Sequence, residues 1–116
     1  MNDQPRGECV KAVRWVTGTA IVDVRGDVDL SRSGEFQQSL LGLMDQRPER
    51  IVINLAEVPY MDSSGVASLV KLLSRARRQQ VVLRLAGMTD RVRSIFEITR
   101  LDGIFDIHAT VEEALG

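Results

Sequence analysis

The segment from Ile51 to Leu73, IVINLAEVPYMDSSGVASLVKLL, constrains the fold of this chain more than any other. It opens with a nearly continuous apolar run, residues 51–55, which is typical of a strand buried on both faces in a parallel sheet. Further on, apolar residues recur at the spacing of the inner face of a helix: Val66, Leu69, Val70 and Leu73. The sequence therefore predicts a buried strand, a short loop and an amphipathic helix.

The loop of this unit carries two hydroxyl side chains, Ser63 and Ser64, between Asp62 and Gly65. We expect both serines at or next to the start of the helix, where free backbone N–H groups meet the positive end of the helix dipole. Gly65 lacks a side chain at a point where another molecule could approach the backbone. The loop is therefore the first candidate for a functional site.

The flanking segments predict further strands and helices around this unit. Residues 9–16 roughly alternate apolar and polar, and residues 19–24 are rich in β-branched side chains, so we expect an antiparallel hairpin with its turn at Thr17-Gly18. Ser31 is the expected N-cap of the first helix. The inner face of this helix is predicted to be Phe36, Leu40, Leu43 and Met44, and Pro48 closes it. A third helix is predicted with the inner face Val92, Ile95, Phe96 and Thr99, ending at Asp102-Gly103. The same criteria predict strands at 81–85 and 104–107 and a last helix capped by Thr110.

The predicted order is ββαβαβαβα, which indicates a single α/β domain with a mixed, mostly parallel sheet. A chain of 116 residues is the size of one domain, with residues 1–7 expected to form a flexible tail and residues 8–116 the folded part. Fifteen basic and 16 acidic residues give a formal net charge of −1, which does not favour nucleic acid or an anionic membrane as the main partner. The single Cys9 fits a reducing cytoplasm, and no apolar stretch reaches the length of a membrane span.

The Asp62-Ser63-Ser64-Gly65 motif, in this strand–loop–helix frame, resembles the signature of the STAS domain, most closely that of bacterial anti-sigma factor antagonists. The resemblance covers most of the chain, from Gly26-Asp27-Val28-Asp29 to the C-terminal strand and helix. It implies a βα superhelix in which strands follow one another across the sheet. It also implies that Ser63 is a phosphorylation site, with Ser64 as the alternative, and that the Asp27/Asp29 loop belongs to a partner-binding surface together with residues 62–65.

Simpler interpretations of the same residues stay open at this point. Either serine could merely cap the helix, while Asp62 could be no more than a carboxylate at a helix N-terminus, although we expect it to shape the loop and help a kinase orient Ser63. Asp27 and Asp29 could belong to a solvated turn. Nothing in the sequence indicates an enzyme or a metal site, because the chain has one histidine, His108, and lacks the usual hydrolase and nucleotide-binding motifs. No cofactor is expected.

The resemblance implies a non-catalytic, cytoplasmic signalling module. Its partners would be an anti-sigma factor that is also a serine kinase of the GHKL type, using ATP and Mg²⁺, and a metal-dependent serine phosphatase that reverses the modification. Unphosphorylated protein would sequester the anti-sigma factor, and phosphorylation of Ser63 would end the complex. The alternative is an accessory subunit of a lipid-transport ABC complex, docking on its ATPase through the same loop face.

Overall fold

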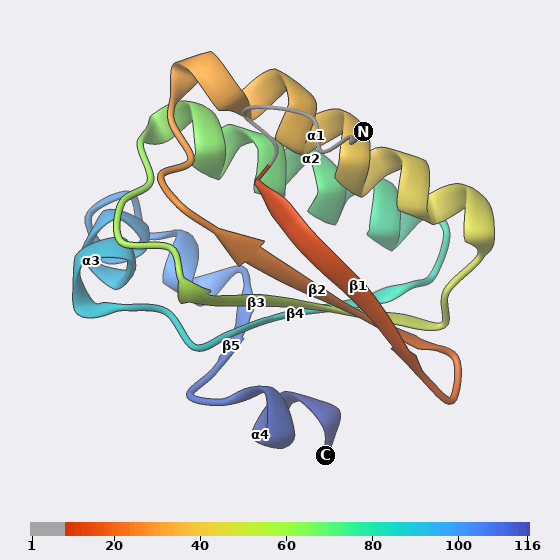
Figure 1. The fold of residues 1–116 in the computed structure, drawn as a ribbon. Coiled ribbons are helices and arrows are strands. Elements are labelled where there is room, and N and C mark those ends of the chain that lie inside the picture. The colour runs from red at the N-terminus through yellow and green to blue at the C-terminus, as the bar shows by residue number, and fades with distance from the viewer. Residues whose placement is uncertain (1–8) are drawn as a thin grey trace.

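The computed structural model describes residues 9–116 and contains one five-stranded sheet (Figure 1). Its strands lie in chain order across the sheet, and β1 is antiparallel to β2 whereas all other neighbours are parallel. Their bounds are β1 (Val10–Val16), β2 (Thr19–Arg25), β3 (Arg50–Glu57), β4 (Val82–Ala86) and β5 (Asp106–His108). The predicted hairpin, parallel pairing and strand order are confirmed.

Helices α1 and α2 lie side by side over one face of the sheet, and α4 lies against the other (Figure 1). The helices are α1 (Leu30–Leu43), α2 (Ser63–Arg78), α3 (Asp90–Ile98) and α4 (Val111–Leu115), with 3₁₀ turns η1 (Met44–Gln46) and η2 (Leu101–Gly103). The element order is the predicted ββαβαβαβα. The predicted tail, residues 1–7, lies outside the described residues.

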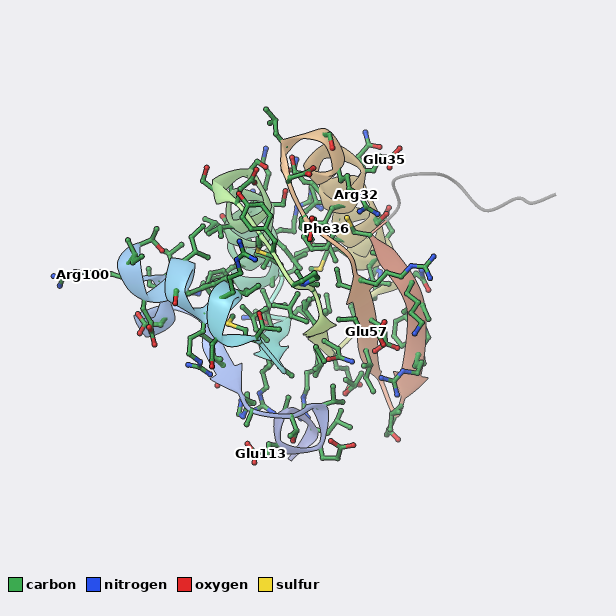
Figure 2. The ribbon with its side chains drawn as sticks, turned by 60° about the vertical axis from the view of Figure 1, so that its left-hand side comes forward. Arg32, Glu35, Phe36, Glu57, Arg100 and Glu113 are labelled. Atoms are coloured by element: carbon green, nitrogen blue, oxygen red, sulfur yellow. The ribbon has the colours of Figure 1, made fainter. Side chains whose placement is uncertain are left out.

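The core explains why β3 is so apolar. Ile51 and Ile53 point into the large cluster beneath α1, α2 and α3, whereas Val52 points to the other face and packs in a smaller cluster that includes Ala114 of α4. Phe36 points from α1 toward the sheet, while Arg100 points away from the molecule (Figure 2). A strand covered on both faces needs apolar residues at successive positions, and the sequence of β3 supplies them.

Several predicted details of the helices are wrong. Asp29, not Ser31, is the N-cap of α1, because its carboxylate accepts a hydrogen bond from the Ser31 amide at 3.1 Å. On α2, Val70 is exposed and Leu72 is buried, because the buried stripe continues toward Ala76 rather than through residue 70.

Helix ends also depart from the prediction. The third helix stops at Ile98, before the predicted end at residues 102–103, because Arg100 adopts a left-handed conformation. Thr99, expected on its inner face, is exposed. Helix α1 gives way to a 3₁₀ turn at Met44, four residues before Pro48. In each case the chain turns through local backbone geometry that residue spacing does not encode.

Candidate functional site

The loops that follow β2 and β3 lie side by side at the end of the sheet where the parallel strands finish. Val28 and Met61 form an isolated parallel bridge; the Val28 amide donates to the Tyr60 carbonyl at 3.0 Å, and the Asp62 amide donates to the Val28 carbonyl at 3.2 Å. The carboxyl ends of parallel strands lie at the same end of the sheet, so both loops emerge there and lead directly into α1 and α2. The Asp27/Asp29 loop and the serine loop are therefore neighbours, as predicted. We call this end of the sheet the serine rim.

Asp62 organises the serine rim by joining the N-termini of two helices. Its Oδ1 accepts hydrogen bonds from the amides of Ser64 at 2.9 Å and Gly65 at 3.3 Å, and also from the Ser64 hydroxyl. Its Oδ2 accepts a hydrogen bond from the amide of Leu30, the first residue of α1, at 3.1 Å. The hydrogen bond from the Ser64 hydroxyl, followed by those from the backbone amides, holds the pKa of Asp62 below its usual value. The carboxylate therefore fixes the shape of the loop.

The two serines occupy different environments although they are neighbours in the sequence. Neither serine is the N-cap of α2, because Asp62 takes that position. The Ser64 side chain is half-buried and its hydroxyl is bonded to Asp62. Ser63, the first residue of the helix, is exposed, and its hydroxyl makes no hydrogen bond within residues 9–116. Of the two serines, Ser63 is thus the one whose hydroxyl is free to react or to meet another molecule.

Gly65 is buried beneath the loop. A Cβ atom added at Gly65 would lie 2.8 Å from the Val28 carbonyl oxygen, 2.8 Å from Val28 Cγ1 and 2.7 Å from Met61 Cγ. Such contacts are too short for any side chain, so the residue that closely approaches Gly65 is Val28 of the same chain. The segment before α1 can pack against the first turn of α2 only because residue 65 has no side chain.

The remaining predicted residues lie on the same rim, with different degrees of exposure. Asp29 is half-buried and accepts hydrogen bonds from both the amide and the hydroxyl of Ser31, at 3.1 and 2.7 Å. Asp27 is exposed, and its backbone carbonyl lies 3.9 Å from the Sγ atom of Cys9. Burial is the main reason why the pKa of the Cys9 thiol is raised. Asp29 is therefore a helix cap, and Asp27 presents a free surface charge.

Sequence reasoning missed two exposed apolar residues beside the serine loop. The Leu30 side chain is 77% exposed at the first turn of α1, although its amide is held by Asp62. Tyr60 is also exposed, and the guanidinium carbon of Arg91 lies 5.6 Å from the centre of its ring. An apolar residue at a helix start is expected in the core by its residue type alone, so the sequence carries no signal for the exposure of Leu30.

Two further properties concern the whole described region. No group of three or more His, Cys, Asp or Glu side chains within residues 9–116 is arranged to hold a metal ion. Helices long and apolar enough to cross a membrane are likewise lacking in this part of the chain.

The family model described as "STAS domain" matches residues 11–114. The chain belongs to the STAS domain family. This STAS domain is 31% identical over 91 residues to the anti-sigma-B factor antagonist of Bacillus subtilis, covering 78% of this chain and 83% of that protein.

Solved structures show the same fold. An anti-sigma factor antagonist from Mycobacterium paratuberculosis is 22% identical and superposes with a TM-score of 0.83, over 90% of this chain and 88% of that one. SpoIIAA in its unphosphorylated form is 24% identical, with a TM-score of 0.76 over 90% and 91% of the two chains. A Bacillus SpoIIAA has also been solved in its phosphorylated form. The STAS fold of this domain is thus shared with these proteins.

Proposed function

We propose that this STAS domain is an anti-sigma factor antagonist whose binding is switched by phosphorylation of Ser63. The observation that carries the proposal is the contrast within the serine pair: Ser63 is exposed with a free hydroxyl, while the Ser64 hydroxyl is bonded to Asp62. The relative from Bacillus subtilis is named an anti-sigma-B factor antagonist, and SpoIIAA is named an anti-sigma factor antagonist. Both names support the same function for this chain.

A phosphate on Ser63 would be compatible with the folded domain. It would add a charge of about −1.5 to −2 at the N-terminus of α2, where the helix dipole favours anions. The N-terminus of α1 lies next to it through the Asp62–Leu30 hydrogen bond. Modification would therefore change the surface of the rim while leaving the packing beneath it intact.

The same phosphate would be unfavourable for a docked partner. The rim already carries Asp27, Asp29 and Asp62, so the modification concentrates negative charge on a surface that a partner must desolvate. Exposed Leu30 and Tyr60 offer that partner apolar contact beside the charges. We assign partner binding to Asp27, Asp29, Ser63 and Ser64 together with these two residues, while Asp62 and Gly65 act by shaping the loop.

The partner in this proposal is an anti-sigma factor that is itself a GHKL-type serine kinase. The domain binds it in the unphosphorylated state, the kinase transfers a phosphoryl group from ATP to the Ser63 hydroxyl, and the complex separates. A metal-dependent serine phosphatase restores the free hydroxyl. The domain acts as the substrate and binding partner of these enzymes and performs no catalysis itself.

Affinity capture from the native cell tests this function. Immobilised wild-type protein and the Ser63→Asp variant are exposed to the same lysate, and the retained proteins are identified by mass spectrometry. We expect a GHKL-type kinase on the wild type and little of it on Ser63→Asp. Capture of a transporter ATPase in its place, retained equally by both proteins, would contradict the proposal and support the lipid-transport alternative.

A further inference from the structure

Strand β1 forms a long edge of the sheet and exposes apolar side chains along it. Val13, Trp15 and Val16 are 39%, 44% and 47% exposed, and no strand within residues 9–116 pairs with the outer side of β1. The other edge strand, β5, has only three residues. A long edge with exposed apolar residues is a template for pairing with another strand.

The hairpin geometry determines which backbone groups of β1 point outward. Thr17 and Gly18 both have positive φ, 45° and 78°, and Val16 pairs with Thr19, as in a two-residue type I′ turn. The pair that flanks such a turn is hydrogen-bonded, and bonded and non-bonded pairs then alternate along the hairpin. The N–H and C=O groups of Val13 and Trp15 therefore point away from β2, to the free edge.

Arg14 is the one charged residue within residues 12–16 of this edge, and its charge is compensated by an acidic residue of the same chain. The Arg14 guanidinium donates to both carboxylate oxygens of Asp23 on β2, at 2.7 and 2.9 Å. This pair draws Arg14 back over its own sheet, and the hydrogen bond to Arg14 is the main reason why the pKa of Asp23 is lowered. A register shift between Val10 and Ala12 ends the regular part of the strand, so the usable edge is residues 12–16.

We propose that this edge pairs antiparallel with the same edge of a second copy, about a twofold axis at Arg14. This register places Val13 opposite Trp15 of the second copy, and Ala12 opposite Val16, so that apolar side chains meet on both faces. The outward backbone groups of Val13 and Trp15 are the ones that hydrogen-bond across this axis.

A second copy suits this edge because, in this register, each apolar residue of one copy lies opposite an apolar residue of the other. The two Arg14 side chains face each other at the axis, and each is neutralised by its own Asp23. The edge runs from Ala12 toward the Thr17–Gly18 turn, away from the serine rim, so pairing does not depend on the proposed function. Five residues from each copy make a small interface, for which we expect a dissociation constant between roughly 10 µM and 1 mM.

Sedimentation velocity of the full chain from about 10 µM to about 1 mM tests the pairing. We expect a concentration-dependent monomer–dimer equilibrium that Val13→Lys weakens at least tenfold. Val82→Lys, at a similarly exposed valine on β4, is the matched control and should dimerise as the wild type does. Trp15 is the only tryptophan, so its fluorescence should shift to shorter wavelength as the wild type dimerises.

A second pair of variants tests the role of charge. Asp23→Asn leaves Arg14 uncompensated at the axis and should weaken the dimer at least tenfold, whereas the double variant Asp23→Asn/Arg14→Gln should restore it. Melting curves confirm that both variants are folded. A wild type that stays monomeric at about 1 mM, or a dimer that Val13→Lys leaves unchanged, would overturn the proposal.

Discussion

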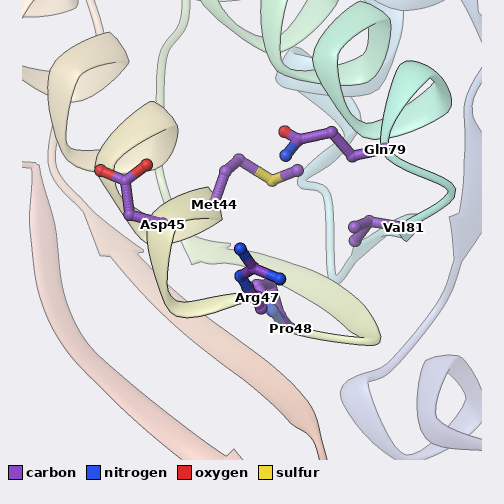
Figure 3. Close-up of a pocket in the computed structure, with 6 residues that line it drawn as sticks. All are labelled: Met44, Asp45, Arg47, Pro48, Gln79 and Val81. Atoms are coloured by element: carbon purple, nitrogen blue, oxygen red, sulfur yellow. The ribbon is translucent and has the colours of Figure 1, made fainter.

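The serine rim and the opposite end of the sheet are built differently. At the rim, α1, α2 and α3 begin, and the side chains of Asp29, Asp62 and Thr89 cap them. At the opposite end, α1 and α2 finish with bonds between backbone groups only, around a hollow of about 520 Å³. The residues that line this hollow are Met44, Asp45, Arg47, Pro48, Gln79 and Val81 (Figure 3).

The difference shows that a pronounced hollow and the most organised hydrogen bonding need not coincide. At the rim, the Asp62 carboxylate and the Ser64 hydroxyl beside Ser63 are committed to hydrogen bonds, whereas the Ser63 hydroxyl is left free. The hollow has polar and apolar walls, but the side chains that line it make no hydrogen bond within residues 9–116. A preorganised rim suits a protein partner, because protein interfaces depend on complementary surfaces more than on cavities.

The largest expected effect is a loss of partner affinity when a negative charge is added at the serine rim but not when it is added at the hollow. Ser63→Asp places a carboxylate beside Asp62 in the proposed interface, and a like-charge clash there costs several kcal/mol, so we expect partner affinity to fall by about a hundredfold or more. Arg47→Asp, at the hollow, should leave affinity unchanged. Both proteins should melt close to the wild type, because both positions are exposed. Isothermal titration calorimetry measures this; equal losses at both ends would mean that the partner does not distinguish them.

A smaller effect concerns the packing beneath the rim. Gly65→Ala should lower the free energy of unfolding by about 1–3 kcal/mol, because the new methyl group would overlap Val28 and Met61. Gly42→Ala is the matched control: this helical glycine has open space around it, and alanine there should stabilise α1 by up to about 1 kcal/mol. Urea denaturation gives both values. A Gly65→Ala protein as stable as the wild type would show that the helices can separate without cost.

The smallest effect concerns the cap. Asp62→Ala should cost about 1 kcal/mol, and Asp62→Asn about half of that, because asparagine still caps but cannot accept all four hydrogen bonds. The pKa of Asp62 is lowered in the fold, so its ionised form stabilises the protein above its unfolded-state pKa of about 3.9. This contribution is lost as the pH falls through the lowered pKa.

Denaturation of wild type and Asp62→Asn at neutral pH and near pH 3 checks the sign of this dependence. The difference in unfolding free energy between the two proteins should shrink at the lower pH. A difference that grows on acidification would mean that Asp62 is not held in its ionised form by the loop.

The fold was predictable from the sequence because its main signals are local. The continuous apolar run of β3 and the helical spacing of Val66, Leu69 and Leu73 do not depend on distant contacts. The rim was less predictable, because Asp62 bonds to Leu30, a residue 32 positions earlier. Spacing alone could not choose between Ser31 and Asp29 as a cap, nor reveal that Val28 lies over Gly65.

Phosphosite mapping tests the central claim most directly. Wild type, Ser63→Ala and Ser64→Ala are incubated with the captured kinase and ATP, and the modified peptide is sequenced by mass spectrometry. Because Ser63 is the exposed and free hydroxyl of the serine pair, we expect one phosphate on Ser63 in the wild type and in Ser64→Ala, and none in Ser63→Ala. Phosphate on Ser64 with Ser63 unmodified would contradict the account.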